Sequence, residues 1–478
     1  MKFFPKKLSL KWINQAYDNN ELTPYELVDE ILKRAEENKD KNIWIVAPSR
    51  ELMEKYISKL PPRSEDKPLW GIPFAIKDNI DLEGVPTTAA CPEYSYMPKK
   101  SAFVVQKLID AGAFPVGKKT LYQFATGLVG TRSPYGEVHN AYDDKMISGG
   151  SSSGSAVSVA LGMAAFSLGT DTAGSGRVPA MLNTLVGFKP SLGAWSTSGV
   201  VPACASLDCV TVFANSLEDT ETVNQYAKGY DAECVWSKEY EDKGKKLPEK
   251  IYLPLEEPVF FGDNADVHKA KWYSATERIK KLGVKVEYID YKMFYDAALI
   301  LYDGAYVAER WADLKEFVIE NEDKVFPVTK KILQSGGTEE KTAARLFEDL
   351  HMLQYYRHKA KEILKNAVMV MPTAGGTFTR EQVREDPVKT NSLMGLYTNH
   401  CNLLDLMAVA VPENTQDKNL PFGITIFGLA DSTNLVLQTA ESFLKTESID
   451  FAVCGLHKKG YALESQLTEL GAEYIEST

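Results

Sequence analysis

The sequence predicts an α/β protein, in which strands and helices alternate along the chain. Short apolar runs punctuated by Gly, Pro and Ser begin at Trp70, for example GIPFAIKDNI and AFPVGKK, and such runs are typical of buried strands joined by tight loops. At residues 250–289, a strand-like KIYLPLE, an amphipathic helix and a strand-like VKVEYID form a βαβ pattern. Strand-like runs return in AVMVMPT, LMAVAVP and FGITIFG. This alternation is the pattern of an α/β fold.

The first sixty residues are predicted to be helical. Thr23 has N-cap chemistry in front of PYELVDEILKRAEEN, and Pro24 would take the first helical position. The run AVSVALGMAAFSL at residues 156–168 is almost wholly small and apolar, which favours a helix buried on every side. Further helices are expected at about residues 293–318 and 341–366.

The order of these elements suggests a domain organisation. We expect residues 1–447 to form one domain, in which a helical and βαβ middle segment, about 250–366, forms part of the substrate pocket. Residues 448–478 begin with a strand and a helix and then stop. We therefore expect them to be the start of a truncated further domain.

The composition of the chain excludes several classes of function. Hydrophobic residues make up 44% of the 478 residues and charged residues 25%, so a packed fold is expected. The net charge of −11 argues against nucleic acid as a partner. No long apolar run predicts a membrane span, and the amino terminus lacks signal-peptide character. The six cysteines include no CxxC pair, which favours a reducing, cytoplasmic location. The sequence contains no cluster of residues with metal-ligand spacing, so we expect no metal and no other cofactor.

Two Gly/Ser clusters stand out, at residues 149–154 and 169–176. Glycine in such loops permits close backbone approach, and successive free N–H groups form an anion-binding nest. Beside a serine hydroxyl, that nest can serve as an oxyanion hole. A nucleophilic serine also needs a base. Only His139 among the six histidines is near in sequence, whereas Lys77 follows an apolar strand-like run, where burial would favour its neutral form.

Three motifs together resemble the amidase signature family. They contain Lys77 in GIPFAIKDN, Ser151 in SGGSSSGSA and Ser175 in GTDTAGSGR, and the two serines are 24 residues apart, as in that family. The resemblance extends from about residue 10 to residue 445. It implies the amidase signature fold, a central twisted mixed β-sheet covered by helices on both faces.

The resemblance also implies a role for each residue. Ser175 would be the acyl-enzyme nucleophile, neutral Lys77 the base, and Ser151 the proton relay behind a cis Gly150–Ser151 peptide. The remaining family positions form the oxyanion hole and support its loop: Thr172, Ala173, Gly174 and Ser175 as backbone donors, and Ser152, Asp171 and Arg177 as structural supports.

Within the family, three stretches resemble the allophanate hydrolases: QFATGLVGTRSPYGEVHNAYD, STSGVVPACASLDCVTVFANS and LYDGAYVAERWADL. That resemblance implies hydrolysis of allophanate, a urea that carries a carboxylate, to ammonia and N-carboxycarbamate. Tyr302 and Arg310 match the positions that bind the carboxylate, and their spacing places them on roughly one face of a single helix. Gly127 and Gly150 complete the expected substrate-binding set.

The same resemblance implies partners. It links the chain to a urea carboxylase. The product would then be processed either by a C-terminal-type domain on a separate chain or by spontaneous breakdown. By analogy with relatives it also implies a homodimer.

Two other motif interpretations fit less well. Residues 150–154 also read GxSxG, the nucleophile elbow of α/β-hydrolases with Ser152 as nucleophile, but AYDDKMISG before it is too polar for the strand that this motif requires. Residues 112–118 have P-loop spacing, but Lys119 stands where Ser or Thr must reach Mg²⁺.

Other functions within and outside the family stay open. A non-catalytic scaffold would leave the presence of Lys77, Ser151 and Ser175 unexplained. An amidase for a different small amide, or the glutaminase subunit of an amidotransferase, would share all three residues. Arg310 is the residue that discriminates between these substrates.

Overall fold

The computed structural model describes residues 4–64, 67–414, 420–446, 459–460 and 467. Within them, eleven strands form one sheet in the order β1-β3-β2-β4-β6-β5-β10-β11-β9-β7-β8. The bounds are β1 Trp44–Val46, β2 Pro73–Lys77, β3 Phe114–Lys119, β4 Phe166–Asp171, β5 Val186–Lys189, β6 Cys209–Ala214, β7 Lys250–Pro254, β8 Lys285–Ile289, β9 Ala367–Pro372, β10 Leu406–Pro412 and β11 Gly423–Leu429.

The sheet is mixed. Strands β3, β2 and β4 run parallel, as do β9, β7 and β8, and the pairs between these two groups are antiparallel. The βαβ unit predicted at 250–289 thus supplies one edge of the sheet. The predicted domain start at 448–478 lies almost wholly outside the described residues.

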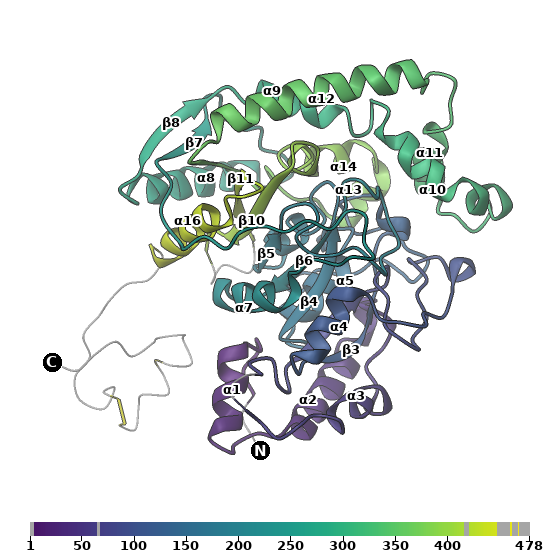
Figure 1. Ribbon diagram of the computed structural model, residues 1–478, viewed down its shortest axis with the longest axis vertical. Helices are drawn as coiled ribbons and strands as arrows, with labels where there is room; N and C mark the ends of the chain where they lie inside the picture. Colours follow the sequence, from purple (N-terminus) through teal and green to yellow (C-terminus); the bar gives the residue numbers. More distant parts are fainter. Residues whose placement is uncertain (1–3, 65–66, 415–419, 447–458, 461–466, 468–478) are drawn as a thin grey trace.

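Helices cover both faces of this sheet (Figure 1). Side chains of β9 alternate between two cores, because Val368 and Val370 join one while Met369 and Met371 join the other. The α-helices are α1 Leu10–Asp18, α2 Pro24–Glu37, α3 Arg50–Ile57, α4 Phe103–Asp110, α5 Ser153–Ala160, α6 Val178–Leu182, α7 Leu217–Ala227, α8 Ala265–Lys280, α9 Lys292–Leu299, α10 Tyr306–Glu320, α11 Pro327–Ser335, α12 Ala343–Ile363, α13 Arg380–Glu385, α14 Lys389–Met394, α15 His400–Leu403 and α16 Thr433–Lys445. Short 3₁₀ turns are η1 Lys39–Lys41, η2 Pro92–Tyr94 and η3 Gln123–Ala125.

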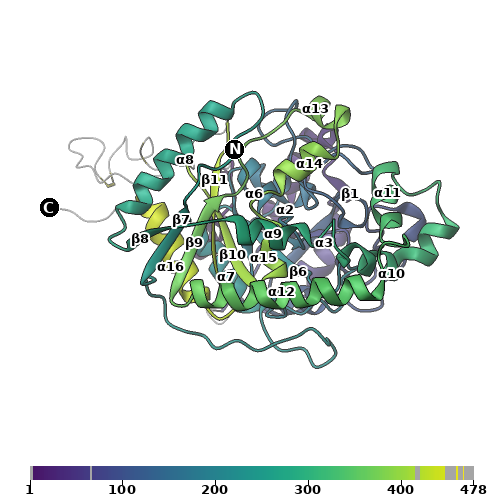
Figure 2. The same cartoon turned by 90° about the horizontal axis from the view of Figure 1, so that it is seen from above.

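The views show where the middle segment lies. Helix α12 spans one end of the molecule, opposite α1–α3 (Figure 1). Helices α10 and α11 lie side by side near one end of α12 (Figures 1 and 2). No helix among the described residues is long and apolar enough to cross a membrane.

Two predicted helices differ in the structure. The apolar run at 156–168 is divided between α5 and β4, because Gly162, with φ +68°, ends the helical stretch and the following residues join the sheet. A run apolar on all sides fits a buried strand as well as a buried helix. The predicted helix at 293–318 is also two helices, α9 and α10, with a break at residues 300–305.

The break is fixed by packing against α12. The Ala305 N–H donates to Asp349 Oδ2 at 2.7 Å. A Cβ on Gly304 would lie 2.5 Å from the Ile300 carbonyl oxygen, so only glycine fits.

The predicted start of α2 is confirmed and can be tested. Thr23 Oγ1 accepts from the Glu26 N–H at 3.3 Å, and Glu26 accepts from the Thr23 N–H at 2.9 Å, which forms a capping box. We expect Thr23→Ala to lower the free energy of unfolding by about 1 kcal/mol, because the helix loses its cap. Thr23→Ser, which keeps the hydroxyl, is the control in urea denaturation. Equal stability of the two variants would contradict the capping role.

Candidate active site

The two predicted Gly/Ser clusters and Lys77 lie together on the side of the sheet where strands β2 and β4 end. Lys77 is the last residue of β2, and β4, which runs parallel to β2, ends at Asp171. Because β2 and β4 are parallel neighbours, their carboxyl ends lie next to each other, and the loop after β4 begins beside Lys77. That loop, residues 172–177, contains Ser175 and leads into α6.

The Lys77 amine is fully buried among hydroxyl groups. Its Nζ lies 2.7 Å from Ser151 Oγ and 2.7 Å from Thr170 Oγ1. A neutral amine can accept a proton from such a hydroxyl, whereas an ammonium group only donates. Thr170 was not singled out from the sequence, although it lies in the same GTDTAGSGR motif as Ser175.

Burial also sets the charge of this amine. Removal from water disfavours the ammonium form and lowers the pKa of Lys77 to about 7, against the opposing charges of Asp208 and Asp171. At neutral pH a substantial fraction of Lys77 is therefore uncharged and able to act as a base.

Ser151 stands just before α5, and the peptide bond between Gly150 and Ser151 is cis. The next residue, Ser152, is buried and donates from its Oγ to the Thr170 carbonyl at 3.1 Å. Ser152 thus holds the first cluster against β4. No strand precedes it, since residues 141–150 form turns, irregular backbone and two isolated β-bridges, so the nucleophile-elbow interpretation fails.

Asp171 organises the loop that contains Ser175. Its carboxylate accepts from the N–H groups of Gly174 at 2.8 Å and Gly176 at 2.9 Å, and from Arg177 Nε and Nη2 at 3.0 Å each. Burial opposes ionisation of Asp171, but the Arg177 guanidinium holds the pKa of that carboxyl below its usual value. Both residues are fully buried, so the geometry agrees with supporting positions for the pair.

The backbone donors differ from the sequence expectation in one respect. The Gly174 N–H is occupied by Asp171, so it is not free to stabilise an oxyanion. The N–H groups of Thr172, Ala173 and Ser175 donate to no other residue in the described part of the chain. The Ser175 side chain is buried but makes no hydrogen bond to another described residue, Ser151 included.

Arg310 belongs to α10 in the middle segment and contacts the loop that contains Thr126. It is 1% exposed, and its Nη1 donates to Thr126 Oγ1 at 3.4 Å. The guanidinium lies 5.3 Å from the centre of the Tyr302 ring. Tyr302 belongs to the break before α10, so the two residues do not share one helix as expected, yet they remain in contact.

The loop beside Arg310 contains Gly127, which has φ +139°. A Cβ there would lie 2.3 Å from the Tyr122 ring, so the position excludes any side chain. Gly127 therefore keeps the backbone next to Thr126 close to its neighbours. The structure gives it no further contact that would define a role in substrate binding.

Asp208 is a second buried group that the sequence did not reveal. Its carboxylate accepts a hydrogen bond from Thr172 Oγ1 and lies within electrostatic reach of both Lys77 and Arg310. Burial raises the pKa of Asp208 to about 6, although its hydrogen bonds from Thr172 and from the backbone of Ala203 and Cys204 favour the charged form. Asp208 is far from Thr172 in sequence, so no local pattern could pair them.

Comparisons with known proteins agree with this arrangement. The chain matches the family model described as Amidase over residues 26–437. It is 36% identical to the urea amidolyase of Saccharomyces cerevisiae over 98% of this chain and 27% of that protein. It is 31% identical to a subunit of the glutamyl-tRNA(Gln) amidotransferase of Methanosarcina mazei, over 81% of this chain and 87% of that one.

The chain belongs to the amidase family. Its structure superposes on Kluyveromyces lactis allophanate hydrolase with a TM-score of 0.84 at 35% identity, covering 98% of this chain and 82% of that one. The predicted family and fold class are thus confirmed. This amidase spans 27% and 24% of the length of the curated urea amidolyases it matches.

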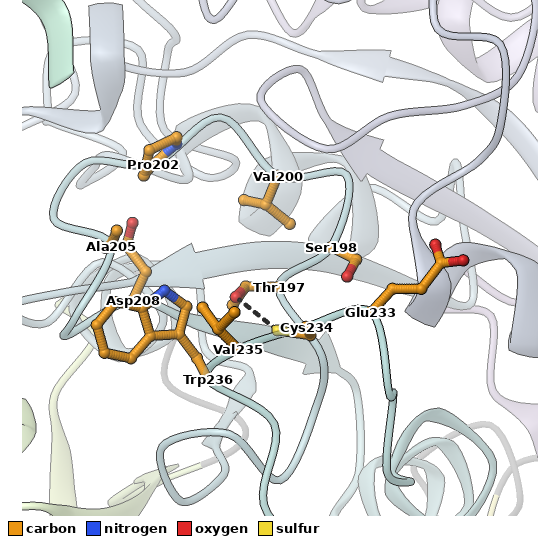
Figure 3. A pocket seen from close by; sticks show the side chains of 10 residues that line it. All are labelled: Thr197, Ser198, Val200, Pro202, Ala205, Asp208, Glu233, Cys234, Val235 and Trp236. Carbon is orange, nitrogen blue, oxygen red and sulfur yellow. Dashed lines mark hydrogen bonds between the residues drawn. The ribbon is translucent and has the colours of Figure 1, made fainter.

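A cavity of about 220 Å³ lies beside the candidate active site, with Asp208 in its wall (Figure 3). Its walls include Asp208, Ala205 and Trp236, but none of Lys77, Ser151 and Ser175 lines it. It therefore reaches Asp208, which accepts a hydrogen bond from Thr172 in the loop of Ser175, but it does not reach the three candidate catalytic residues.

The pKa of Lys77 predicts the pH dependence of this amidase. We expect kcat/KM to rise through a midpoint near pH 7 and to fall about tenfold per unit below it, because only the neutral amine can take up a proton. Lys77→Arg, which keeps a permanent cation, should be inactive at every pH. A pH-independent rate from pH 5 to 9 in the wild type would contradict a base with this pKa.

Proposed function

We propose that this amidase is an allophanate hydrolase, which releases ammonia from allophanate through an acyl-enzyme on Ser175. The buried guanidinium of Arg310 is the observation that carries the substrate class. Arg310 forms no ion pair with any described Asp or Glu, and its Nε has no hydrogen-bond partner among the described residues. Asp208 attracts this guanidinium from a distance but forms no ion pair with it. Because a buried charge without a direct partner is costly, this position favours an anionic substrate group.

The carboxylate of allophanate supplies that anion. An arginine fork can bind a carboxylate with two parallel hydrogen bonds, which fixes orientation as well as position. The Tyr302 ring restrains the guanidinium from one side. The similarity to K. lactis allophanate hydrolase over nearly the whole chain supports the same substrate.

The chemistry follows from the groups around Lys77. Neutral Lys77 takes a proton from Ser151, which in turn takes the proton of the Ser175 hydroxyl as Ser175 Oγ attacks the terminal amide carbon. The free N–H groups of Thr172, Ala173 and Ser175 stabilise the oxyanion. The intermediate expels ammonia as its nitrogen receives the proton back.

Water then completes the cycle. A water molecule, activated by the same relay, attacks the acyl-enzyme and releases N-carboxycarbamate. The Ser175 oxygen recovers its proton, so the enzyme returns to its starting state.

The setting of the reaction is part of the proposal. Allophanate is the product of urea carboxylation, so a urea carboxylase must supply the substrate, and the urea amidolyase relatives support this link. Residues 250–366 would close the substrate pocket through Arg310. Cytoplasmic location and homodimeric assembly complete the proposal by analogy.

Ammonia release by wild type, Ser175→Ala and Arg310→Ala tests this function. With allophanate, we expect Ser175→Ala to lose roughly 10⁶-fold in kcat, because the nucleophile is gone. Arg310→Ala should lose about 30-fold or more in kcat/KM, mainly through KM, since a buried charge pair with the substrate is removed.

The choice of substrates separates the alternatives. Malonamate keeps the carboxylate and malonamide lacks it, so Arg310→Ala should affect the first and spare the second. Preferential hydrolysis of glutamine would favour the amidotransferase subunit, and hydrolysis of benzamide alone would favour an amidase for other amides. Either result would overturn allophanate as the substrate.

A further inference from the structure

Residues 203–208 form a closed loop between the two halves of the site. Asp208 Oδ2 accepts from the N–H groups of Ala203 at 2.7 Å and Cys204 at 3.1 Å. The N–H groups of Leu207 and Asp208 donate to the Cys204 carbonyl at 2.9 and 3.0 Å. These bonds join the two ends of the 203–208 loop to each other.

One side of the 203–208 loop is fastened to α10. The Glu309 carboxylate accepts from the Ser206 N–H at 2.8 Å, from Ser206 Oγ at 2.7 Å and from Cys204 Sγ at 3.1 Å. Glu309 directly precedes Arg310. Hydrogen bonds to a charged acceptor are stronger than neutral ones, so this attachment fixes the start of α10 against the loop.

The other side is fastened to the loop that contains Ser175. Asp208 accepts from Thr172 Oγ1, and Asn402 Nδ2 donates to the carbonyls of Asp171 and Leu207, both at 2.8 Å. The side chains of Asp208 and Asn402 are buried. The 203–208 loop is therefore bonded at once to the helix of Arg310 and to the backbone that precedes Ser175.

We infer that Glu309 is a positioning residue that, through the 203–208 loop, sets the separation between Arg310 and Ser175 and thereby the length of carboxylate-bearing amide that the site accepts. This inference rests on the proposed function. A substrate anchored at Arg310 reacts only if its amide carbon reaches Ser175, and misplacement by about 1 Å can cost 10²-fold in rate. A fixed separation favours one length of substrate. Under the proposed function this is the length of allophanate and malonamate, in which one atom lies between the carboxylate and the amide carbon.

The test compares Glu309→Ala with Glu316→Ala, an exposed glutamate on the same helix. For Glu309→Ala we expect kcat/KM to fall roughly tenfold with malonamate but to stay within about twofold with malonamide, which lacks the anchor. The preference for malonamate over succinamate, which is one methylene longer, should shrink by a similar factor. Glu316→Ala should match the wild type with every substrate.

Two further variants keep the test decisive. Glu309→Gln retains an acceptor for the Ser206 N–H and should restore part of the lost preference. Ser206→Ala removes only one hydrogen-bond donor to Glu309, so it should reduce the preference for malonamate over succinamate by a smaller factor. This variant tests the inference even if Glu309→Ala fails to fold.

The outcomes separate this inference from the proposed function. An equal loss with malonamate and malonamide, or an unchanged malonamate-to-succinamate preference, would overturn the positioning role while the effect of Arg310→Ala leaves the proposed function standing. If wild type ignores carboxylate-bearing amides, or Arg310→Ala costs nothing, the proposed function fails first and the inference falls with it.

Discussion

Burial of the Lys77 amine at the end of β2 is the constraint on which the rest of the site depends. In water this amine would be protonated and could not act as a base. Burial removes the solvation of the ammonium form, so the neutral form becomes accessible. The hydroxyls of Ser151 and Thr170 satisfy the amine without adding charge. Of the carboxylates that oppose the shift, Asp171 is neutralised by its pair with Arg177, which limits its influence.

Burial affects the side chains of Lys77 and Arg310 in different ways. Both are buried cationic residues near Asp208, but lysine can lose its proton whereas arginine cannot. Burial therefore suits Lys77 to the role of base in the proposed mechanism and leaves Arg310 as a fixed positive charge. In the proposed mechanism, proton transfer takes place at one end of a small substrate and anion recognition at the other.

The sequence predicted what local patterns encode. The Thr23 cap and strands β2, β3, β9, β10 and β11 follow from short-range chemistry and from apolar runs. The run at 156–168 predicts one helix, whereas the structure has a helix and a strand, because apolar periodicity is lost where every side is buried. The break at 300–305 depends on Asp349, more than forty residues later, which no local pattern shows.

The candidate site was predictable to the same degree. Family motifs contain Lys77, Ser151 and Ser175, but they do not show that Asp171 occupies the Gly174 amide. Asp208 and Glu309 act through contacts across long stretches of chain, with Thr172 and Ser206 respectively. Such pairs become visible only when the sheet and α10 are assembled.

The most direct test of this account is the titration of Lys77 itself. Protein labelled with ¹³C at lysine Cε, with the Lys77 signal assigned by its loss in Lys77→Met, would report the charge of this amine by NMR. The account predicts a midpoint close to pH 7. A midpoint near 10, the value of a solvated lysine, would contradict it.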